Sequence, residues 1–253
     1  MKNITFVFSI LILFGCSEPV KKASEKSQEN PKETSVLVVN YELNEMTLED
    51  HAKLGSDVVG NFAPGKIDGL IGKTFIGNVD RGVFGGVYYF TSPSSLDAYL
   101  DSELWKGIVA HPNLVNFKTD SYGIAPISDI SNGIASIRKT VKNQDEVMGT
   151  SVLVVNYELN KMTLEDHAKL GSDVVGNFAP GKIDGLIGKT FIGNVDRGVF
   201  GGVYYFTSPS SLDAYLDSEL WKGIVAHPNL VNFKTDTYGI APLSVISNGV
   251  PML

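Results

Sequence analysis

The sequence predicts an α+β fold built from two copies of one domain that pair within the chain. Residues 35–133 align without gaps on residues 151–249, so the repeat is the size of a domain rather than of a solenoid unit. Within each copy the expected elements run in the order βαββαβ, and the expected strands are apolar on both faces. The two copies differ at four positions: Glu45/Lys161, Ser121/Thr237, Ile127/Leu243 and Asp129/Val245.

A strand and a helix are expected to open each copy. The β-rich run Val36–Tyr41 predicts the strand. Thr47 is placed to cap the helix, with Asp50 three residues later as an acidic capping-box partner. Small and apolar residues then recur at helical spacing and predict the buried face of the helix: Leu48, Ala52, Gly55, Val59 and Phe62. Ala63-Pro64-Gly65 is expected to end this helix.

The second half of each copy is expected to hold a hairpin, a helix and a last strand. Three strands are predicted, the first two joined by a turn at 78–82: residues 70–77, 83–90 and 114–122. Ser92-Pro93 is typical of a helix start, with Ser at the cap and Pro at the first helical position. One helix is expected from there as far as Ile108, before His111-Pro112 ends it.

This order of elements is the ferredoxin-like split motif, in which both helices cover one face of a four-stranded antiparallel sheet. The opposite face of the sheet is also expected to be buried. On the first strand, Leu37 and Val39 point to one face. Val36 and Val38 point to the other, whereas a sheet with one solvated face would alternate apolar and polar residues. We therefore expect the two sheets of the chain to pack against each other.

Three segments of each copy resemble the YdhR-like monooxygenase family. In the first copy they read GLIGKTFI at 69–76, GGVYYF at 85–90 and SLDAYL at 95–100, and the likeness extends over nearly the whole copy. This family belongs to the dimeric α+β barrel superfamily, whose members pair as homodimers, sheet against sheet. The resemblance therefore implies an intramolecular dimeric α+β barrel. The linker at 134–150 has 17 residues and reaches about 55 Å when extended, which is enough to place the copies face to face.

The resemblance also implies where a ligand binds and how it reacts. In this superfamily the ligand cavity lies within each copy, between the helices and the sheet. Its cofactor-independent monooxygenases convert the substrate to a carbanion or phenolate that gives an electron to oxygen. No cofactor is therefore expected, and the protein is expected to supply a dry cavity and a base.

His51 and His167 are the candidate catalytic bases. His51 lies one position before Ala52 of the apolar stripe, at the edge of the expected buried face. An imidazole there can titrate near neutral pH and either remove a proton from a substrate or hold a substrate oxygen. The alternative is a boundary histidine that is exposed or bonded to a backbone carbonyl.

The candidates for binding the substrate are aromatic residues and one lysine in each copy. They are Tyr41, Lys73, Tyr89 and Trp105, with Tyr157, Lys189, Tyr205 and Trp221 in the second copy. An aromatic ring with a polar tip suits an aromatic ligand, and a lysine that interrupts an apolar strand can bind an anionic oxygen. The alternatives are plain core packing for the aromatic residues and a solvent-facing sheet edge for the lysines.

Residues 1–15 predict a lipoprotein signal peptide. The apolar run Ile4–Phe14 has eleven residues, fewer than the roughly 20 that a membrane-spanning helix needs. Leu13-Phe14-Gly15-Cys16 resembles a bacterial lipoprotein cleavage box, which makes Cys16 the expected lipidation site. The resemblance implies a location at the cell envelope, in the outer membrane if the cell is Gram-negative. The alternatives are an ordinary signal peptide with an incidental cysteine and a short buried strand.

Residues 16–34 are expected to form a disordered tether between the lipid and the first domain. Apart from Cys16, Val20 is the only large apolar residue in this segment, so burial cannot offset the entropy lost on ordering.

Composition argues against several other kinds of site. The net charge of −7 and the lack of a basic stripe argue against a nucleic-acid surface, which needs clustered lysine and arginine. No Cys/His spacing typical of a metal site and no phosphate-loop motif occurs, so no metal is expected. Cys16 is the only cysteine, which excludes a disulfide within one chain.

Two functions of different kinds follow from these features. The first is a cofactor-independent monooxygenase that acts on small aromatic or phenolic compounds at the cell envelope. The alternative is a lipid-anchored module that binds a hydrophobic small molecule without catalysis. A small-molecule substrate or ligand is expected in either case.

Overall fold

The computed structural model describes residues 34–131 and 151–247 of the chain. The expected signal peptide at 1–15, Cys16, the linker at 134–150 and all of the expected tether except Thr34 lie outside the described residues. Within the described ranges, no helix is long and apolar enough to cross a membrane.

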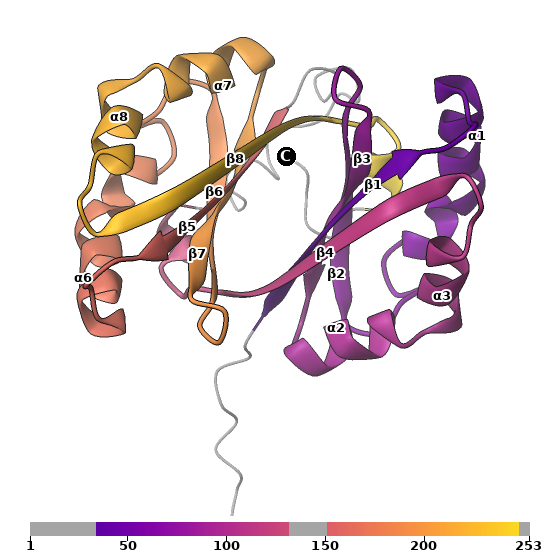
Figure 1. Ribbon diagram of the computed structural model, residues 1–253, viewed down its shortest axis with the longest axis horizontal. Helices are drawn as coiled ribbons and strands as arrows, with labels where there is room; N and C mark the ends of the chain where they lie inside the picture. The colour runs from indigo at the N-terminus through magenta and orange to yellow at the C-terminus, as the bar shows by residue number, and fades with distance from the viewer. Residues whose placement is uncertain (1–33, 132–150, 248–253) are drawn as a thin grey trace, which may run out of the picture. The chain divides into compact units, whose positions relative to one another are not determined.

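Each copy folds as four strands with helices on one side of the sheet, which confirms the expected βαββαβ order (Figure 1). The first copy contains β1 (Ser35–Leu43), α1 (Leu48–Val58), η1 (Val59–Phe62), β2 (Leu70–Asn78), β3 (Val83–Phe90), α2 (Pro93–Leu100), α3 (Glu103–Val109), β4 (Leu114–Ile124) and α4 (Ser128–Ser131). The second copy contains β5 (Ser151–Leu159), α6 (Leu164–Val174), η3 (Val175–Phe178), β6 (Leu186–Asn194), β7 (Val199–Phe206), α7 (Pro209–Leu216), α8 (Glu219–Val225), β8 (Leu230–Ile240) and α9 (Ser244–Ser247).

Two helical features differ from the sequence prediction. The single helix expected from Pro93 to Ile108 is divided into α2 and α3, because Ser102 ends one helix and starts the next. Its hydroxyl donates to the carbonyl of Tyr99 at 2.6 Å and accepts from the backbone N–H of Trp105 at 3.2 Å. Leu48 was expected on the buried face of α1, but it is 51% exposed, because α1 begins at this residue.

The eight strands close into one barrel in the order β1-β3-β2-β8-β5-β7-β6-β4. Two short antiparallel seams join the copies, one between β2 and β8 and the other between β4 and β6. Figure 1 shows β4 and β8 reaching from one half across to the other, with the helices of each copy outside its own sheet. Closure pairs the strand edges of both sheets, so neither sheet has a free edge strand.

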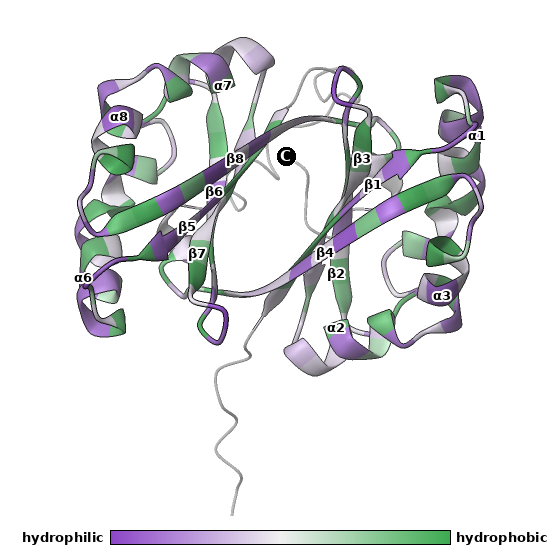
Figure 2. Ribbon diagram, viewed as in Figure 1, coloured by the Kyte–Doolittle hydropathy of each residue, from purple (hydrophilic) through white to green (hydrophobic). Residues whose placement is uncertain are grey.

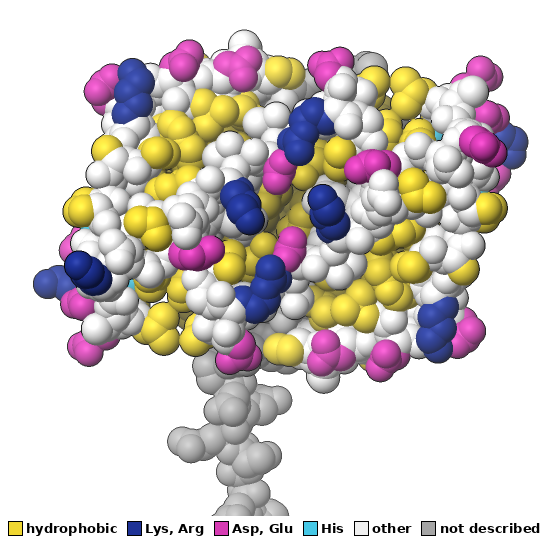
Figure 3. All heavy atoms as spheres, in the orientation of Figure 1, with side chains coloured by type: hydrophobic (Ala, Val, Ile, Leu, Met, Phe, Trp, Pro, Cys, Tyr) yellow, Lys and Arg dark blue, Asp and Glu magenta, His cyan; other side chains and the backbone are white. Residues whose placement is uncertain are grey.

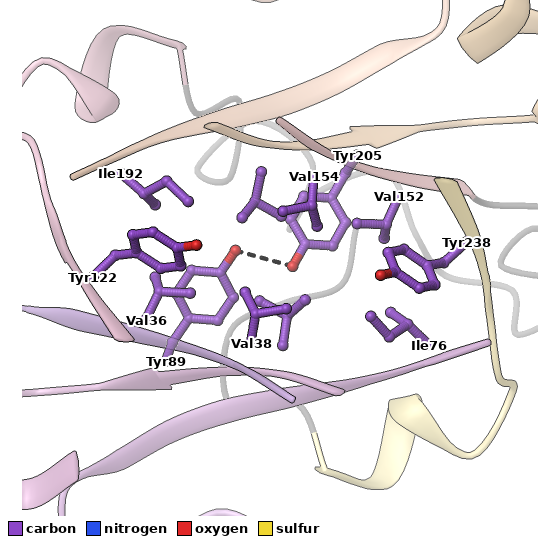
Figure 4. Packing of buried hydrophobic residues seen from close by; sticks show 12 residues of the cluster. Val36, Val38, Ile76, Tyr89, Tyr122, Val152, Val154, Ile192, Tyr205 and Tyr238 are labelled. Atoms are coloured by element: carbon purple, nitrogen blue, oxygen red, sulfur yellow. Dashed lines mark hydrogen bonds between the residues drawn. The ribbon is translucent and has the colours of Figure 1, made fainter. Parts of the chain in front are cut away.

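The barrel interior is a core shared by both copies, as the apolar faces of the strands predicted. Its buried residues are Val36, Val38, Ile76, Val87, Tyr89, Tyr122, Val152, Val154, Ile192, Val203, Tyr205 and Tyr238. At its centre the hydroxyls of Tyr89 and Tyr205 lie 2.9 Å apart and form a hydrogen bond between the copies (Figure 4). Buried phenols usually have such a partner, because an unpaired hydroxyl inside a core is costly.

From the end of its last strand onward, each copy extends onto the other. We call residues 123–131 and 239–247 the crossing segments. Ser131 donates to the carbonyl of Lys189 at 2.6 Å, and Ser247 donates to the carbonyl of Lys73 at 2.7 Å. These four residues are buried, so the hydroxyls satisfy carbonyls that water cannot reach. Each crossing segment therefore fixes the backbone of a strand in the opposite copy, β6 or β2, through a side-chain hydrogen bond.

The surface carries charges of both signs. On the face shown in Figure 3, lysine and arginine side chains alternate with aspartate and glutamate, and no large patch of one sign appears. Two of the ion pairs join the copies, Arg81 with Asp236 and Arg197 with Asp120, each at 2.6 Å. The arginine side chains are about half exposed, so each pair contributes only about 0–1 kcal/mol. Figure 2 places the hydrophobic residues mainly on the strands and the inner sides of the helices.

The paired glycines of GGVYYF are required by close approaches on the sheet. A side chain at Gly85 would overlap the carbonyl oxygen of Val39 on the neighbouring strand β1. A Cβ at Gly86 would lie 3.0 Å from Cε of Lys73 and 2.9 Å from the Tyr88 ring. The first glycine therefore permits strand pairing, and the second leaves room for the lysine stem.

Gly85→Ala is expected to lower the free energy of unfolding by about 3 kcal/mol, because β1 and β3 must separate to admit the methyl group. Gly107→Ala is the matched control, since nothing lies within 4 Å of the added Cβ and the position is helical. That change is expected to be neutral or to stabilise by up to about 1 kcal/mol. Urea unfolding measures both, and equal effects at the two positions would contradict the assigned role of Gly85.

Candidate functional site

Two equivalent cavities lie between the helices and the sheets, one of about 600 Å³ in the first copy and one of about 660 Å³ in the second. The superfamily resemblance implied cavities within each copy alone, and the structure corrects this. Gly239–Leu243 of the second copy form one wall of the first cavity, and Gly123–Ile127 of the first copy form the same wall of the second. The crossing segments thus complete the cavities.

A tyrosine and a histidine form a pair on the wall of each cavity. In the first copy the hydroxyl oxygen of Tyr41, on β1, lies 2.9 Å from Nε2 of His51. Thr47 caps α1 by accepting the N–H of Asp50, and this start places His51 in the first turn, facing the sheet. The His51 ring also packs on Phe84 with the ring centres 4.6 Å apart. In the second copy the same distance of 2.9 Å joins Tyr157 and His167.

Burial keeps this pair uncharged. It lowers the pKa of His51 below the ordinary value of about 6.5, so the ring is neutral at pH 7. Burial also raises the pKa of Tyr41 above its ordinary range and that of Tyr157 to about 12. When Tyr41 donates to Nε2 of His51, Nδ1 carries the ring proton. The neutral ring can therefore accept a proton at Nε2 if a substrate hydroxyl displaces Tyr41.

Lys73 is enclosed by aromatic rings. The residue is 5% exposed, which excludes the solvent-facing sheet edge as its position. Strand alternation places Lys73 and Phe75 on the helix side of β2, while Ile76 points into the barrel. Nζ of Lys73 lies 3.5 Å from the centre of the Phe62 ring, 3.7 Å from that of Phe75 and 4.6 Å from that of Tyr88.

The amine of Lys73 forms no ion pair or hydrogen bond with any of the described side chains. Burial therefore lowers its pKa well below the ordinary value of about 10.4. Contact with three ring faces favours the cation and opposes this shift. Lys189 repeats the arrangement with Phe178, Phe191 and Tyr204.

The other predicted binding residues lie elsewhere. Tyr89 and Tyr205 point into the barrel and are not among the residues that line either cavity. Trp105 packs between Tyr99 and Phe117, with ring centres 5.7 Å and 6.0 Å away, and Trp221 occupies the equivalent place in the second copy. The structure places neither tryptophan on a cavity wall, so core packing describes all four residues.

Sequence reasoning missed the residues that the opposite copy supplies. Leu243 lines the first cavity and Ile127 lines the second. Leu243 and Ile127 occupy equivalent positions, one of the four at which the two copies differ. The apolar stretch after the last strand was visible in the sequence, but nothing local indicated which copy it would cover.

The cavities suit a neutral or weakly acidic organic ligand. Their walls are mainly aliphatic and aromatic. In the first cavity, the titratable side chains among the lining residues are Tyr41, His51, Lys73, Tyr88, Glu103 and His111. His111 has a structural hydrogen bond, since its Nδ1 accepts the backbone N–H of Asn113 at 3.3 Å. Within residues 34–131 and 151–247, no group of three His, Cys, Asp or Glu side chains is placed to hold a metal ion.

The sequence of the chain matches one family model in a comparison with known proteins. The family model described as "Putative mono-oxygenase ydhR" matches the chain twice, at residues 36–134 and 152–250. A search of curated proteins gave no match.

Solved structures share the fold at low sequence identity. A protein from Fusobacterium nucleatum described as a putative monooxygenase aligns with a TM-score of 0.58 and 8% identity, over 82% of this chain and 92% of that one. An anthrone oxidase-like protein aligns with a TM-score of 0.55 and 14% identity, over 83% and 92%. A putative monooxygenase from Lactobacillus acidophilus aligns with a TM-score of 0.51 and 11% identity, over 82% and 94%.

Replacing both buried lysines by methionine (Lys73→Met with Lys189→Met) is expected to raise the free energy of unfolding at pH 7. The unfolded lysines have a pKa of about 10.4, and burial lowers the folded value, so the unfolded state binds more protons between the two values. The stability of the unsubstituted protein therefore rises with pH in that window. The advantage of the variant should shrink as pH approaches about 10.4.

Urea unfolding at several pH values measures this difference. The control replaces the exposed pair (Lys118→Met with Lys234→Met) and should show no such pH-dependent difference. Parallel pH profiles for the buried-lysine variant and the unsubstituted protein would contradict a lowered lysine pKa.

Proposed function

Because the chain belongs to the ydhR family of putative mono-oxygenases, we propose that it oxidises small aromatic or phenolic compounds with molecular oxygen and without a cofactor. Family membership supports a general monooxygenase-like function. The finer assignment depends mainly on one observation: a neutral imidazole bonded to a phenol at 2.9 Å on the wall of a mostly apolar cavity.

In the proposed reaction, His51 or His167 acts as the base. A phenolic substrate takes the place of the Tyr41 hydroxyl at Nε2 of His51 and gives up its proton. The phenolate then transfers one electron to oxygen, and the radical pair combines to a hydroperoxide. Loss of water gives a quinone, so a phenol with a free para C–H plus O₂ yields a p-quinone plus water. All electrons come from the substrate.

The other cavity groups orient the substrate in this proposal. Tyr41 holds the imidazole in place until the substrate displaces its hydroxyl, and Lys73 donates a hydrogen bond to an oxygen of the substrate or of the reduced dioxygen. The apolar walls exclude water, which strengthens these interactions and protects the reactive intermediate. Each cavity contains the full set of groups, so both are proposed to be active.

We further propose that the protein is anchored at the cell envelope through lipid on Cys16. This proposal is supported only by the sequence, in the cleavage-box pattern Leu13-Phe14-Gly15-Cys16. In a Gram-negative cell, the serine after Cys16 favours the outer membrane.

Cys16→Ser is expected to remove the lipid and release the protein from the membrane fraction of the source cell. Fractionation followed by detection of the protein measures this. A variant that remains wholly in the membrane fraction would refute anchoring through Cys16.

His51→Gln with His167→Gln is expected to lower oxygen uptake by about 100-fold to 10,000-fold, the usual contribution of a general base. Uptake is measured with a panel of phenols, quinols and anthrone, the last chosen because one fold relative is described as anthrone oxidase-like. Because His51 is protonated at low pH, uptake should also fall as pH drops through its lowered pKa.

The matched control is His111→Gln with His227→Gln. These histidines also line the cavities, but each accepts a hydrogen bond from a backbone N–H. It should lower uptake less than about tenfold. Unchanged uptake after loss of His51 and His167 would rule them out as bases. Saturable binding of a panel compound that is recovered unchanged, with no oxygen consumed, would favour the binding module instead.

A further inference from the structure

Among the described residues, each cavity contains one primary amine, and no acidic side chain neutralises it. Of the described residues that line the first cavity, one carries a carboxylate: Glu103, whose side chain is 91% exposed and paired with Lys106 at 2.8 Å. The remaining titratable groups on that wall are Tyr41, His51, Tyr88 and His111. No negative charge therefore faces Lys73 from the described elements that pack around it. The second cavity repeats this with Lys189 and Glu219.

The amine is also held in one place. The rings of Phe62 and Phe75 contact Nζ on the helix side, and Gly86 leaves space for the stem of Lys73. The backbone at Lys73 is fixed by Ser247 of the opposite copy, which donates to its carbonyl at 2.7 Å. A lysine confined in this way cannot swing into solvent, as an exposed lysine would. Its reactive atom stays at the wall of a cavity large enough for a small aromatic molecule.

We propose that Lys73 and Lys189 bind aldehydes and ketones covalently, as imines, inside the two cavities. The ligand class is a small aromatic carbonyl compound, because the cavity walls are apolar and the amine is flanked by ring faces. This activity is independent of oxygen and goes beyond the proposed oxidation.

Imine formation needs no reactant other than the amine and the carbonyl compound. The lone pair of Nζ attacks the carbonyl carbon, a C–N bond forms, and the C=O π electrons move to oxygen. A proton passes from nitrogen to that oxygen to give a carbinolamine. The hydroxyl group then leaves as water with the second proton, and a C=N bond remains. One amine and one carbonyl compound give one imine and one water, and nothing is oxidised or reduced.

Burial supplies the reactive form of the amine. Only an unprotonated amine is nucleophilic, and lysines in apolar pockets act as nucleophiles for this reason. Burial lowers the pKa of Lys73, so the free amine is present at a pH where exposed lysines are protonated. The Tyr41–His51 pair lines the same cavity and can exchange the protons that the carbinolamine takes up and releases.

The test treats the full chain with benzaldehyde and sodium cyanoborohydride, which reduces an imine to a stable benzylamine. Peptide mapping by mass spectrometry then locates the benzyl groups. Near pH 6.5 we expect Lys73 and Lys189 to be modified at least about tenfold faster than Lys118 and Lys234, since each unit of lowered pKa gives about tenfold more free amine. In urea, where the chain is unfolded, this preference should disappear.

Two variants complete the experiment. Lys73→Met with Lys189→Met should lose the fast modification, and Lys118→Met with Lys234→Met should keep it. The mapping of the unsubstituted protein does not depend on whether either variant folds. Equal or slower modification of Lys73 and Lys189 in the folded chain would overturn the proposal. Because the assay contains no oxidation step, its outcome is separate from that of the oxygen-uptake assay.

Discussion

The structure depends on one constraint, which is that each four-stranded sheet is apolar on both faces. One face is covered by the helices of its own copy, and the other must be covered by a second sheet. The copies meet this need by closing a single barrel, with seams between β2 and β8 and between β4 and β6. Closure carries the end of each copy onto the other, and these crossing segments complete the cavities.

The same apolar surroundings determine the chemistry of the site. In water at pH 7 a lysine is charged, whereas a histidine and a tyrosine are mainly neutral. Burial shifts the pKa of each side chain in the direction that favours its neutral form. Tyr41 and His51 have each other as partners, whereas the described residues around the amine of Lys73 offer it aromatic rings. A cavity of this kind offers proton acceptors and a nucleophile without fixed charge, which suits ligands that are themselves apolar.

The repeat, the strands, the 78–82 turn and the Ser92-Pro93 helix start could be predicted from the sequence, because they depend on local periodicity and capping. The break at Ser102 was missed because serine fits a helix surface as well as a cap. The positions of the buried lysines and of the crossing segments depend on contacts between residues far apart in the chain, 174 positions for Ser247 and Lys73 and 58 for Ser131 and Lys189. No local pattern encodes them. Tyr89 was a binding candidate but points into the barrel, and the sequence could not show this because both faces of β3 are apolar.

Joining the two copies in one chain has a genetic consequence. In a dimer of identical subunits, a single mutation alters the same wall of both cavities at once. Here the wall of the first cavity is encoded near the end of the second copy, and that of the second cavity near the end of the first, at Leu243 and Ile127. One codon change can therefore reshape one cavity and leave the other intact. The fused chain can hold two sites of different selectivity, which a symmetric pair of subunits cannot.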